Sequence, residues 1–212
     1  QKITLLGFSS YYPVQGGDMG SSLVENTGTD ADTVDMVQAF KAKGFSMNQT
    51  VADMYEALQP TFKSEVQSWG GTIEYNHITA PSTTGVFSSK EPSQAALDGQ
   101  NATWKDSMND NNVMIVTIAR SASENGTYQP GTAGVDPTQN LNQTDPLGLS
   151  DDERDLINAA VTAKAANGGK VIVLLNNASA MEVQEIEDNV GVDAILQVGL
   201  PGGYGFYGVA DI

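Results

Sequence analysis

Residues 113–119 form the apolar run Val113-Met114-Ile115-Val116-Thr117-Ile118-Ala119, and a long polar stretch from Arg120 to Ser150 follows it. A short, continuous apolar run rich in β-branched residues predicts a strand that is buried on both faces. The polar stretch is rich in Gly, Pro, Asn, Thr and Asp, and loops of this length are usually functional or disordered. Because ligands of open α/β sheets bind beyond the carboxyl ends of strands, Glu124 is the first candidate for a functional residue.

Further strands and helices are predicted on both sides of this run. The strands are expected at residues 2–8, 72–75, 170–177 and 192–200, and the helices at 30–43, 50–69, 91–109, 150–167, 180–188 and 207–212. Pro60 is expected to break or kink the second helix. Strands that alternate with helices predict an α/β fold, a three-layer sandwich in which a mostly parallel sheet has helices on both faces. We expect residues 1–212 to form a single domain of this kind.

Two of the helices carry more detailed expectations. Ser150 and Glu153 form a capping-box sequence just before an apolar-periodic run, and Gly168 is the expected end of that helix. The helix at 91–109 is weaker, and its candidate buried residues are Ala95, Leu97, Trp104 and Met108. Both helices flank the central strand in sequence, so their burial tests the predicted layering.

The composition excludes several classes of function. The 212 residues include 26 Asp and Glu but only 10 Lys and Arg, a net charge of −16, which argues against binding to nucleic acid or to an anionic membrane surface. No apolar run approaches the ~20 residues that span a bilayer. There is no Cys, and His77 is the single His, which excludes disulfides, thiolate catalysis, His-based triads and multi-His metal sites within this chain. No metal site and no cofactor is therefore predicted.

A glycine-rich loop follows the first predicted strand, at Gly16 to Ser22. Such a loop can hold a phosphate when a helix follows at once, but it lacks the Gly-x-Gly-x-x-Gly spacing. It is interpreted either as a tight turn or as a direct ligand contact. The loops after the strands at 3–8, 113–119 and 192–200 are expected to share one edge of the sheet, where a common site can form.

Four segments, in the same order along the chain, resemble motifs of glycoside hydrolase family 3. They are the opening strand and glycine loop (Leu5 to Gly7 and Gly16 to Ser21), the strand and loop Ile115 to Gly126, the helix start Leu147 to Ile157, and the closing strands, Pro-Gly loop and Ala-Asp helix (Val171 to Asn176, Ala194 to Gly202 and Val209 to Ile212). The second segment resembles the apolar strand of that family that leads to Arg, Ser, Gly, Glu and Gly. The resemblance covers nearly the whole chain.

This resemblance implies the α/β sandwich domain of a β-glucosidase-like enzyme, with Glu124 as the general acid/base of a retaining mechanism. The nucleophile of the family is an Asp on a separate (β/α)8 barrel, and nothing in these residues predicts such a barrel. We therefore expect a fragment of a larger glycosidase that is inactive alone, with the barrel domain of the same parent chain and a carbohydrate as its partners. A chain that begins with Gln1 is consistent with a processed or excised piece, of a bacterial cytoplasmic or secreted protein.

Several residues near the predicted site have more than one interpretation. Glu124 is either the acid/base or an exposed loop carboxylate. Arg120 and Tyr128 are candidate substrate-binding residues, although Arg120 could instead hold the loop, pair with Glu124, or bind backbone or another carboxylate. Tyr11, Tyr12 and Tyr204 could stack on a sugar or simply pack. Rival functions for the whole chain are a flavodoxin-like module that binds a small ligand at Gly16 to Ser22, and a purely structural domain.

Overall fold

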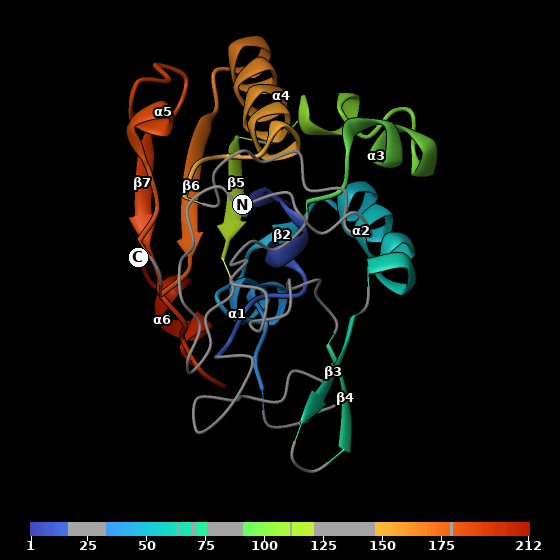
Figure 1. The fold of residues 1–212 in the computed structure, drawn as a ribbon. Helices are drawn as coiled ribbons and strands as arrows, with labels where there is room; N and C mark the ends of the chain where they lie inside the picture. Colours follow the sequence, from blue (N-terminus) through green and yellow to red (C-terminus); the bar gives the residue numbers. More distant parts are fainter. Residues whose placement is uncertain are drawn as a thin grey trace.

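The computed structural model describes residues 1–16, 33–62, 64–68, 71–75, 91–110, 112–120, 147–178 and 180–212. Its main sheet has five strands in the order β2-β1-β5-β6-β7, and every neighbouring pair is parallel (Figure 1). These strands are β1 (Lys2–Leu6), β2 (Ser46–Met47), β5 (Val113–Ala119), β6 (Lys170–Asn176) and β7 (Ala194–Gln197). Since all five run in the same direction, their carboxyl ends meet at one edge.

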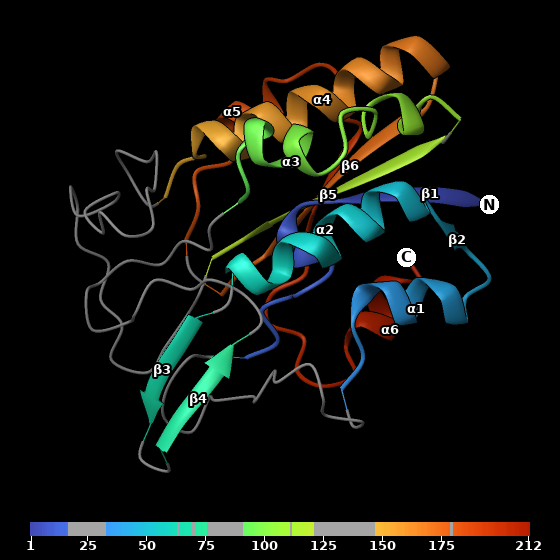
Figure 2. The same ribbon diagram turned by 90° about the vertical axis from the view of Figure 1, so that its right-hand side faces the viewer.

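Helices cover both faces of this sheet, as Figure 2 shows. On one face lie α2 (Gln49–Phe62), α3 (Gln94–Gln100) and α4 (Asp151–Asn167), and on the other lie α1 (Met36–Ala42) and α6 (Phe206–Val209). Alternate residues of the strands feed the two cores: Val116 of β5 packs with the first group of helices, whereas Ile115 packs with the second. The predicted three-layer α/β sandwich is confirmed.

The central strand and the helix after the long loop agree closely with the sequence prediction. Strand β5 covers the predicted residues, Val113–Ala119, and six of its seven residues are buried. Helix α4 begins after Ser150, whose side chain accepts a hydrogen bond from the Glu153 N–H, and the complete capping box is present. The helix ends at Gly168, which has a left-handed backbone (φ 70°) that glycine adopts without strain.

The predicted helix at 50–69 is wrong in its last part. Helix α2 ends at Phe62, and strand β3 (Ser64–Ser68) follows, paired antiparallel with β4 (Gly71–Tyr75). Pro60 lies in the last turn of α2, where it lacks a backbone N–H and weakens the continuation of the helix. The strand predicted at 72–75 is β4, and it supplies the hydrogen-bonding partner for β3. In both views this hairpin lies beyond the carboxyl edge of the main sheet (Figures 1 and 2).

Other elements are shorter than predicted. Helix α1 begins at Met36, after an Asp35–Gln38 capping box, and residues 17–32 lie outside the described part. The region 91–109 contains α3 and the 3₁₀ helix η4 (Asp106–Met108), whereas 180–188 contains only α5 (Gln184–Glu187). Of the predicted core residues in the region 91–109, three are buried and Ala95 is exposed; the buried ones are Leu97, Trp104 and Met108. No described helix is both long and apolar enough to cross a membrane.

Candidate functional site

The candidate site lies where β1 and β5 end side by side. Strand β1 has β2 on one side and β5 on the other, so the chain departs from β1 in one direction and later returns on its opposite side. Ligands of doubly wound sheets bind at this reversal of strand order, outside the carboxyl ends. Buried polar side chains concentrate around it; they include Ser9, Ser10, Gln15, Glu91, Thr117, Arg120, Ser150, Glu153, Asn176 and Asn177.

Arg120 and Glu153 form a buried ion pair at the carboxyl end of β5. The Arg120 Nη1 and Nη2 atoms donate to Glu153 Oε1 (2.5 Å) and Oε2 (2.9 Å), and both side chains are almost completely buried. Two backbone carbonyls also accept hydrogen bonds from Arg120: Nη1 donates to Ala119 O (2.8 Å) and Nη2 to Gly148 O (2.6 Å). A bidentate pair with further hydrogen bonds is the geometry that compensates for removing two charges from water.

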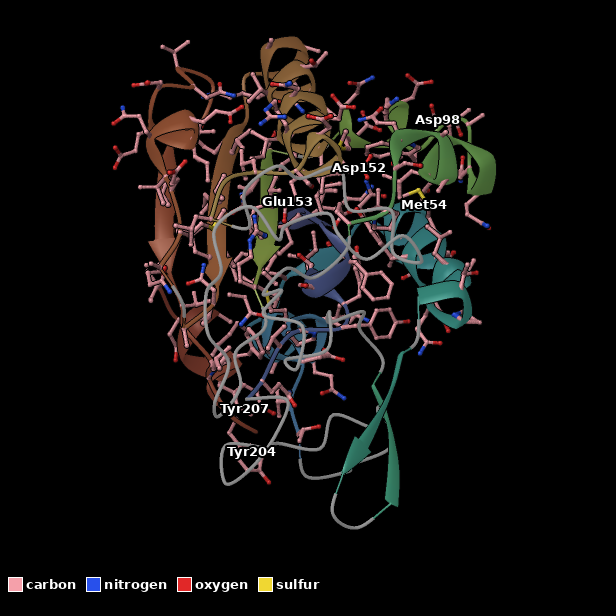
Figure 3. The ribbon with its side chains drawn as sticks, in the orientation of Figure 1. Met54, Asp98, Asp152, Glu153, Tyr204 and Tyr207 are labelled. Atoms are coloured by element: carbon pink, nitrogen blue, oxygen red, sulfur yellow. The ribbon has the colours of Figure 1, made fainter. Side chains whose placement is uncertain are left out.

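This ion pair joins the two ends of the segment at residues 121–146. Arg120 immediately precedes the segment, and Gly148 and Glu153 follow it. Glu153 also accepts from the Ser150 N–H (2.9 Å), so one carboxylate holds both Arg120 and the start of α4. Figure 3 shows Glu153 and Asp152 at this end of α4. We call Arg120, Gly148, Ser150 and Glu153 the loop clamp.

A second buried carboxylate, Glu91, holds the turn that follows β1. Its Oε2 accepts from the Phe8 N–H (2.7 Å) and its Oε1 accepts from the Tyr55 hydroxyl of α2 (3.0 Å). The Tyr55 oxygen accepts in turn from the Gly7 N–H (3.0 Å). Two successive backbone amides of the turn are therefore satisfied by Glu91 and Tyr55. We call Gly7, Phe8, Tyr55 and Glu91 the Glu91 network.

The Glu91 carboxyl has an unusual protonation equilibrium. Burial is the largest cause, and it raises the pKa of Glu91 from 4.5 to about 8, with a smaller contribution from the negative charges of Glu153 and Asp152. The hydrogen bonds from Phe8 and Tyr55 oppose this shift. Burial also raises the pKa of Tyr55 well above its ordinary value, so its hydroxyl keeps its proton. A carboxyl that titrates near neutrality in a buried position is a feature of many functional sites.

The turn after β1 is packed directly on β5. The Ser10 and Thr117 hydroxyls are hydrogen-bonded (2.7 Å), and Ser10 also donates to Leu6 O (2.7 Å). Gly7 has φ 94°, and a Cβ atom at this position would lie 2.4 Å from Thr117 O. Only glycine permits both this backbone conformation and this approach. The Glu91 network is thus coupled to β5 three residues before the loop clamp.

Asn176 connects the remaining strand ends. Its side-chain oxygen accepts from the Val14 N–H (2.8 Å), and its Nδ2 donates to Val14 O and Gly199 O (2.8 Å each). The segments that follow β1, β6 and β7 therefore meet at this amide. The predicted common edge for the ends of the strands at 3–8, 113–119 and 192–200 is confirmed by the parallel order of β1, β5 and β7 in one sheet. Of the predicted glycine loop, only Gly16 lies within the described residues.

Of the other candidate site residues, two tyrosines pack on neighbouring aromatic rings, one tyrosine is exposed, and three residues lie outside the described part of the chain. Tyr11 stacks on Tyr55 (ring centroids 4.9 Å apart) and donates to Leu5 O, whereas Tyr12 packs on Phe8, so both have packing roles. Tyr204 is 59% exposed, and Figure 3 shows it near Tyr207 below α6, on the side of the strand ends. Glu124, Tyr128 and His77 lie outside the described residues.

Two interpretations of Arg120 can be compared with its contacts. Its guanidinium binds backbone carbonyls and another carboxylate, and it holds the loop ends, as two of the sequence interpretations had it. Its role in substrate binding stays a prediction. Sequence reasoning did not identify Glu91 or Tyr55 as site residues, because no local motif marks them. Within the described ranges, no group of three or more His, Cys, Asp or Glu side chains is arranged to hold a metal ion.

Comparisons with known proteins relate this chain by structure rather than by sequence. No protein-family model matches it, and no curated protein sequence matches it. The solved β-glucosidase 3B from Thermotoga neapolitana, in complex with glucose, matches the whole chain with a TM-score of 0.66 and 24% identity. A GH3 exo-β-xylosidase, XlnD, matches with a TM-score of 0.56 and 11% identity, and the β-glucosidase EmGH1 from Erythrobacter marinus with 0.54 and 15%.

These similarities establish a shared fold. All of this chain is covered in each comparison, but it spans only 25%, 20% and 24%, respectively, of the three matched chains. The chain therefore corresponds to about a quarter of the length of these enzymes or less.

Proposed function

We propose that this chain is the α/β sandwich domain of a retaining β-glycosidase resembling glycoside hydrolase family 3, and that Glu124 supplies its general acid/base. The observation that carries the proposal is the loop clamp at the carboxyl end of β5. Arg120 and Glu153 hold both ends of the segment containing Glu124 at the edge where α/β sheets bind ligands. The same fold occurs as part of two β-glucosidases and a β-xylosidase, which supports a β-glucoside-type substrate.

The chemistry of the loop clamp is compatible with a general acid on this segment. A general acid must be protonated near neutrality, and a closely paired guanidinium would lower its pKa. Arg120 gives its two terminal nitrogens to Glu153 and to backbone carbonyls. The cation nearest to Glu124 in the sequence thus has a buried structural carboxylate among its partners.

Retaining hydrolysis needs a second carboxylate. The two carboxyl groups of such enzymes lie about 5–5.5 Å apart, one as nucleophile and the other as acid and then base. We assign the nucleophile to a (β/α)8 barrel domain of the same parent chain, which is the expected partner of this domain. The 212 residues alone should therefore be inactive, and activity should appear only in the full-length parent or when the barrel is added.

The decisive test compares leaving groups in the full-length parent protein. Glu124→Gln should lower kcat/KM by at least about 100-fold for a β-glucoside with a poor leaving group, because protonation of the leaving oxygen is lost. An activated aryl β-glucoside should be much less affected in its first step. Glu124→Ala should recover part of its activity in azide, because this anion attacks the glycosyl-enzyme intermediate without needing a general base and releases the nucleophile as a glycosyl azide forms.

Asp136→Asn is the matched control, since Asp136 is the next carboxylate along the same segment. It should leave both substrates unaffected. Normal cleavage of both substrates by Glu124→Gln would instead show that Glu124 is a loop carboxylate and that the acid lies elsewhere.

A second candidate function rests on the strand order. The sheet order β2-β1-β5-β6-β7 is, with the main-sheet strands counted in sequence, the 2-1-3-4-5 order of flavodoxin-like folds, which bind phosphate-bearing ligands after the first strand. Thermal-shift measurements with flavin mononucleotide and other nucleotides test this alternative. Stabilisation that is lost when Gly16 and Gly17 are replaced would favour a small-ligand module over the glycosidase.

A further inference from the structure

Glu91 is a buried titratable group that the proposed acid/base chemistry does not use. It is 6% exposed and lies at the reversal point of the strand order, between the turn after β1, helix α2 and the start of α4. Its two closest partners are far away in sequence, 36 residues for Tyr55 and 83 for Phe8. A residue that only stabilised one local element would not need such partners.

The hydrogen bonds of the Glu91 network balance only when the carboxyl is ionised. Among the described residues, three donors take part, the Gly7 N–H, the Phe8 N–H and the Tyr55 O–H, and three acceptor atoms receive them, the Tyr55 oxygen and the two Glu91 oxygens. A proton on Glu91 adds a fourth donor. It can be accommodated only by displacing the Tyr55 O–H or by weakening the bond from Phe8.

The surroundings of Glu91 favour this extra proton. The described titratable groups around it are Tyr55 from α2 and Asp152 and Glu153 from α4, with Tyr11 stacked behind Tyr55. Arg120, which follows β5 directly, is connected to this group through Glu153, to which it is bound. Burial, with a smaller contribution from the two carboxylates of α4, raises the pKa of Glu91 to about 8, whereas the hydrogen bonds from Phe8 and Tyr55 favour the anion. The two effects are in competition near neutral pH.

The turn after β1 connects the Glu91 network to β5 by direct contacts. Phe8 and Gly7 are held by the network, Gly7 lies against Thr117 O, and Ser10 is hydrogen-bonded to the Thr117 hydroxyl. Thr117 lies three residues before Arg120, from which the segment with Glu124 continues. The turn that Glu91 and Tyr55 hold is therefore in direct contact with the part of β5 that leads to the loop clamp.

We infer that Glu91 is a positioning residue: by gaining or losing a proton it changes the hydrogen bonds that hold the turn after β1 against the carboxyl end of β5. This inference rests on the proposed function only for its effect on catalysis. The structural switch itself concerns Glu91, Tyr55 and the turn, and it can be tested without any enzymatic activity.

The structural test is hydrogen exchange of the Gly7 and Phe8 amides in the full-length protein between pH 6 and pH 10, measured by mass spectrometry on overlapping peptides. Relative to intrinsic exchange, protection of the Phe8 amide should rise about five- to tenfold as Glu91 ionises, because its hydrogen bond to a carboxylate is stronger than one to a neutral carboxyl. The Gly7 amide donates to the Tyr55 oxygen, so its protection should rise less. In Glu91→Gln the rise should be absent. A rise of the same size in Glu91→Gln would overturn the inference.

Two further variants should shift the pH midpoint of the exchange transition in opposite directions. Tyr55→Phe removes a hydrogen bond that stabilises the anion, so the transition should move to higher pH. Asp152→Asn removes a negative charge, so the transition should move to lower pH. Glu56→Gln, an exposed carboxylate next to Tyr55 on α2, is the control and should leave the midpoint unchanged. If Glu91→Gln fails to fold, opposite shifts in these two variants support the inference, and unchanged midpoints overturn it.

The catalytic test uses the ratio of wild-type kcat/KM to that of Glu91→Gln, because the ratio cancels ionisations that both proteins share. It should be close to one at pH 6 and rise about three- to tenfold by pH 9. A purely structural role would give a ratio that is independent of pH, and that result would overturn the catalytic part of the inference. Normal activity of Glu124→Gln together with a preserved exchange transition would refute the proposed acid/base and leave the Glu91 switch intact.

Discussion

Two buried glutamates lie at the same edge of the sheet in opposite surroundings. Glu153 meets the guanidinium of Arg120 through two hydrogen bonds. Within the described part of the chain, Glu91 meets neutral donors, the Phe8 N–H and the Tyr55 O–H, and the charges that act on it are the negative ones of Glu153 and Asp152. The pKa of Glu91 is accordingly raised to about 8. The two buried carboxyls therefore differ in their partners: Glu153 faces a cation, whereas Glu91 faces neutral donors and other carboxylates.

Of the changes that test this comparison, replacement of Arg120 is expected to have the largest effect on stability. Arg120→Met leaves Glu153 buried without a counter-charge, in a situation like that of Glu91, and should lower the free energy of unfolding by about 3–5 kcal/mol. Urea unfolding at pH 7 measures the loss. The adjacent control is Arg154→Met, whose ion pairs with Asp151 and Glu185 are exposed and should contribute less than about 1 kcal/mol.

The double variant Arg120→Met, Glu153→Leu separates the charge from the packing. Replacing both partners by apolar residues removes the uncompensated charge, so most of the lost stability should return. Equal instability of the single and double variants would mean that the Arg120 contacts to the Ala119 and Gly148 carbonyls, and not the ion pair, hold the loop ends together.

The pH dependence of stability tests the second glutamate. The pKa of Glu91 is about 8 in the folded state and near 4.5 when unfolded, so between these values the folded protein binds a proton that the unfolded chain has released. Its contribution to stability is therefore complete below pH 4.5 and is lost as the pH rises towards 8. Relative to Glu91→Gln, the wild-type free energy of unfolding should fall by about 2–4 kcal/mol over this range. A constant difference between the two proteins would contradict a raised pKa.

Gly7 tests whether the turn in the Glu91 network needs its close contact with β5. Gly7→Ala introduces a Cβ atom 2.4 Å from Thr117 O at a φ of 94°, and should destabilise the protein by about 2–3 kcal/mol. Gly44→Ala is the matched control, because Gly44 has a similar φ of 85° but open space around it; its cost should be about 1 kcal/mol. Thermal unfolding of both variants gives the difference that is due to the contact alone. Equal losses of stability in the two variants would show that β5 shifts to accommodate the added Cβ atom.

The fold could be predicted from the sequence wherever the signals are local. The continuous apolar run of β5 and the capping box of α4 are each complete within a few residues, and both elements have the expected positions. Strand β2 has only two residues and no pattern of its own, so it was not predicted. Strand β3 is paired with β4. The helical periodicity of the preceding residues favoured a helix there, and the sequence does not show this pairing.

The candidate site, too, could be predicted from the sequence only where the signal is local, as the two glutamates show. The capping box predicted the place of Glu153 on α4, but its partner Arg120 lies 33 residues away and was left with several interpretations. Glu91 had no signal, because its partners come from the turn after β1 and from α2, and their distances in sequence obey no spacing rule. Long-range burial, which sets both the pairing and the raised pKa, follows from the packed fold and not from any one segment.

The smallest expected effect separates the two tasks of Glu153, which holds Arg120 and also completes the capping box. Ser150→Ala removes the hydroxyl that accepts from the Glu153 N–H, yet leaves the Ser150 N–H bonded to Glu153 Oε2. The loss should be about 1 kcal/mol, the usual value of an N-cap side chain, and urea unfolding measures it. A loss comparable to that of Arg120→Met would mean that the cap, more than the guanidinium, fixes the Glu153 carboxylate. The contrast with Glu91 would then rest on helix geometry instead of on charge.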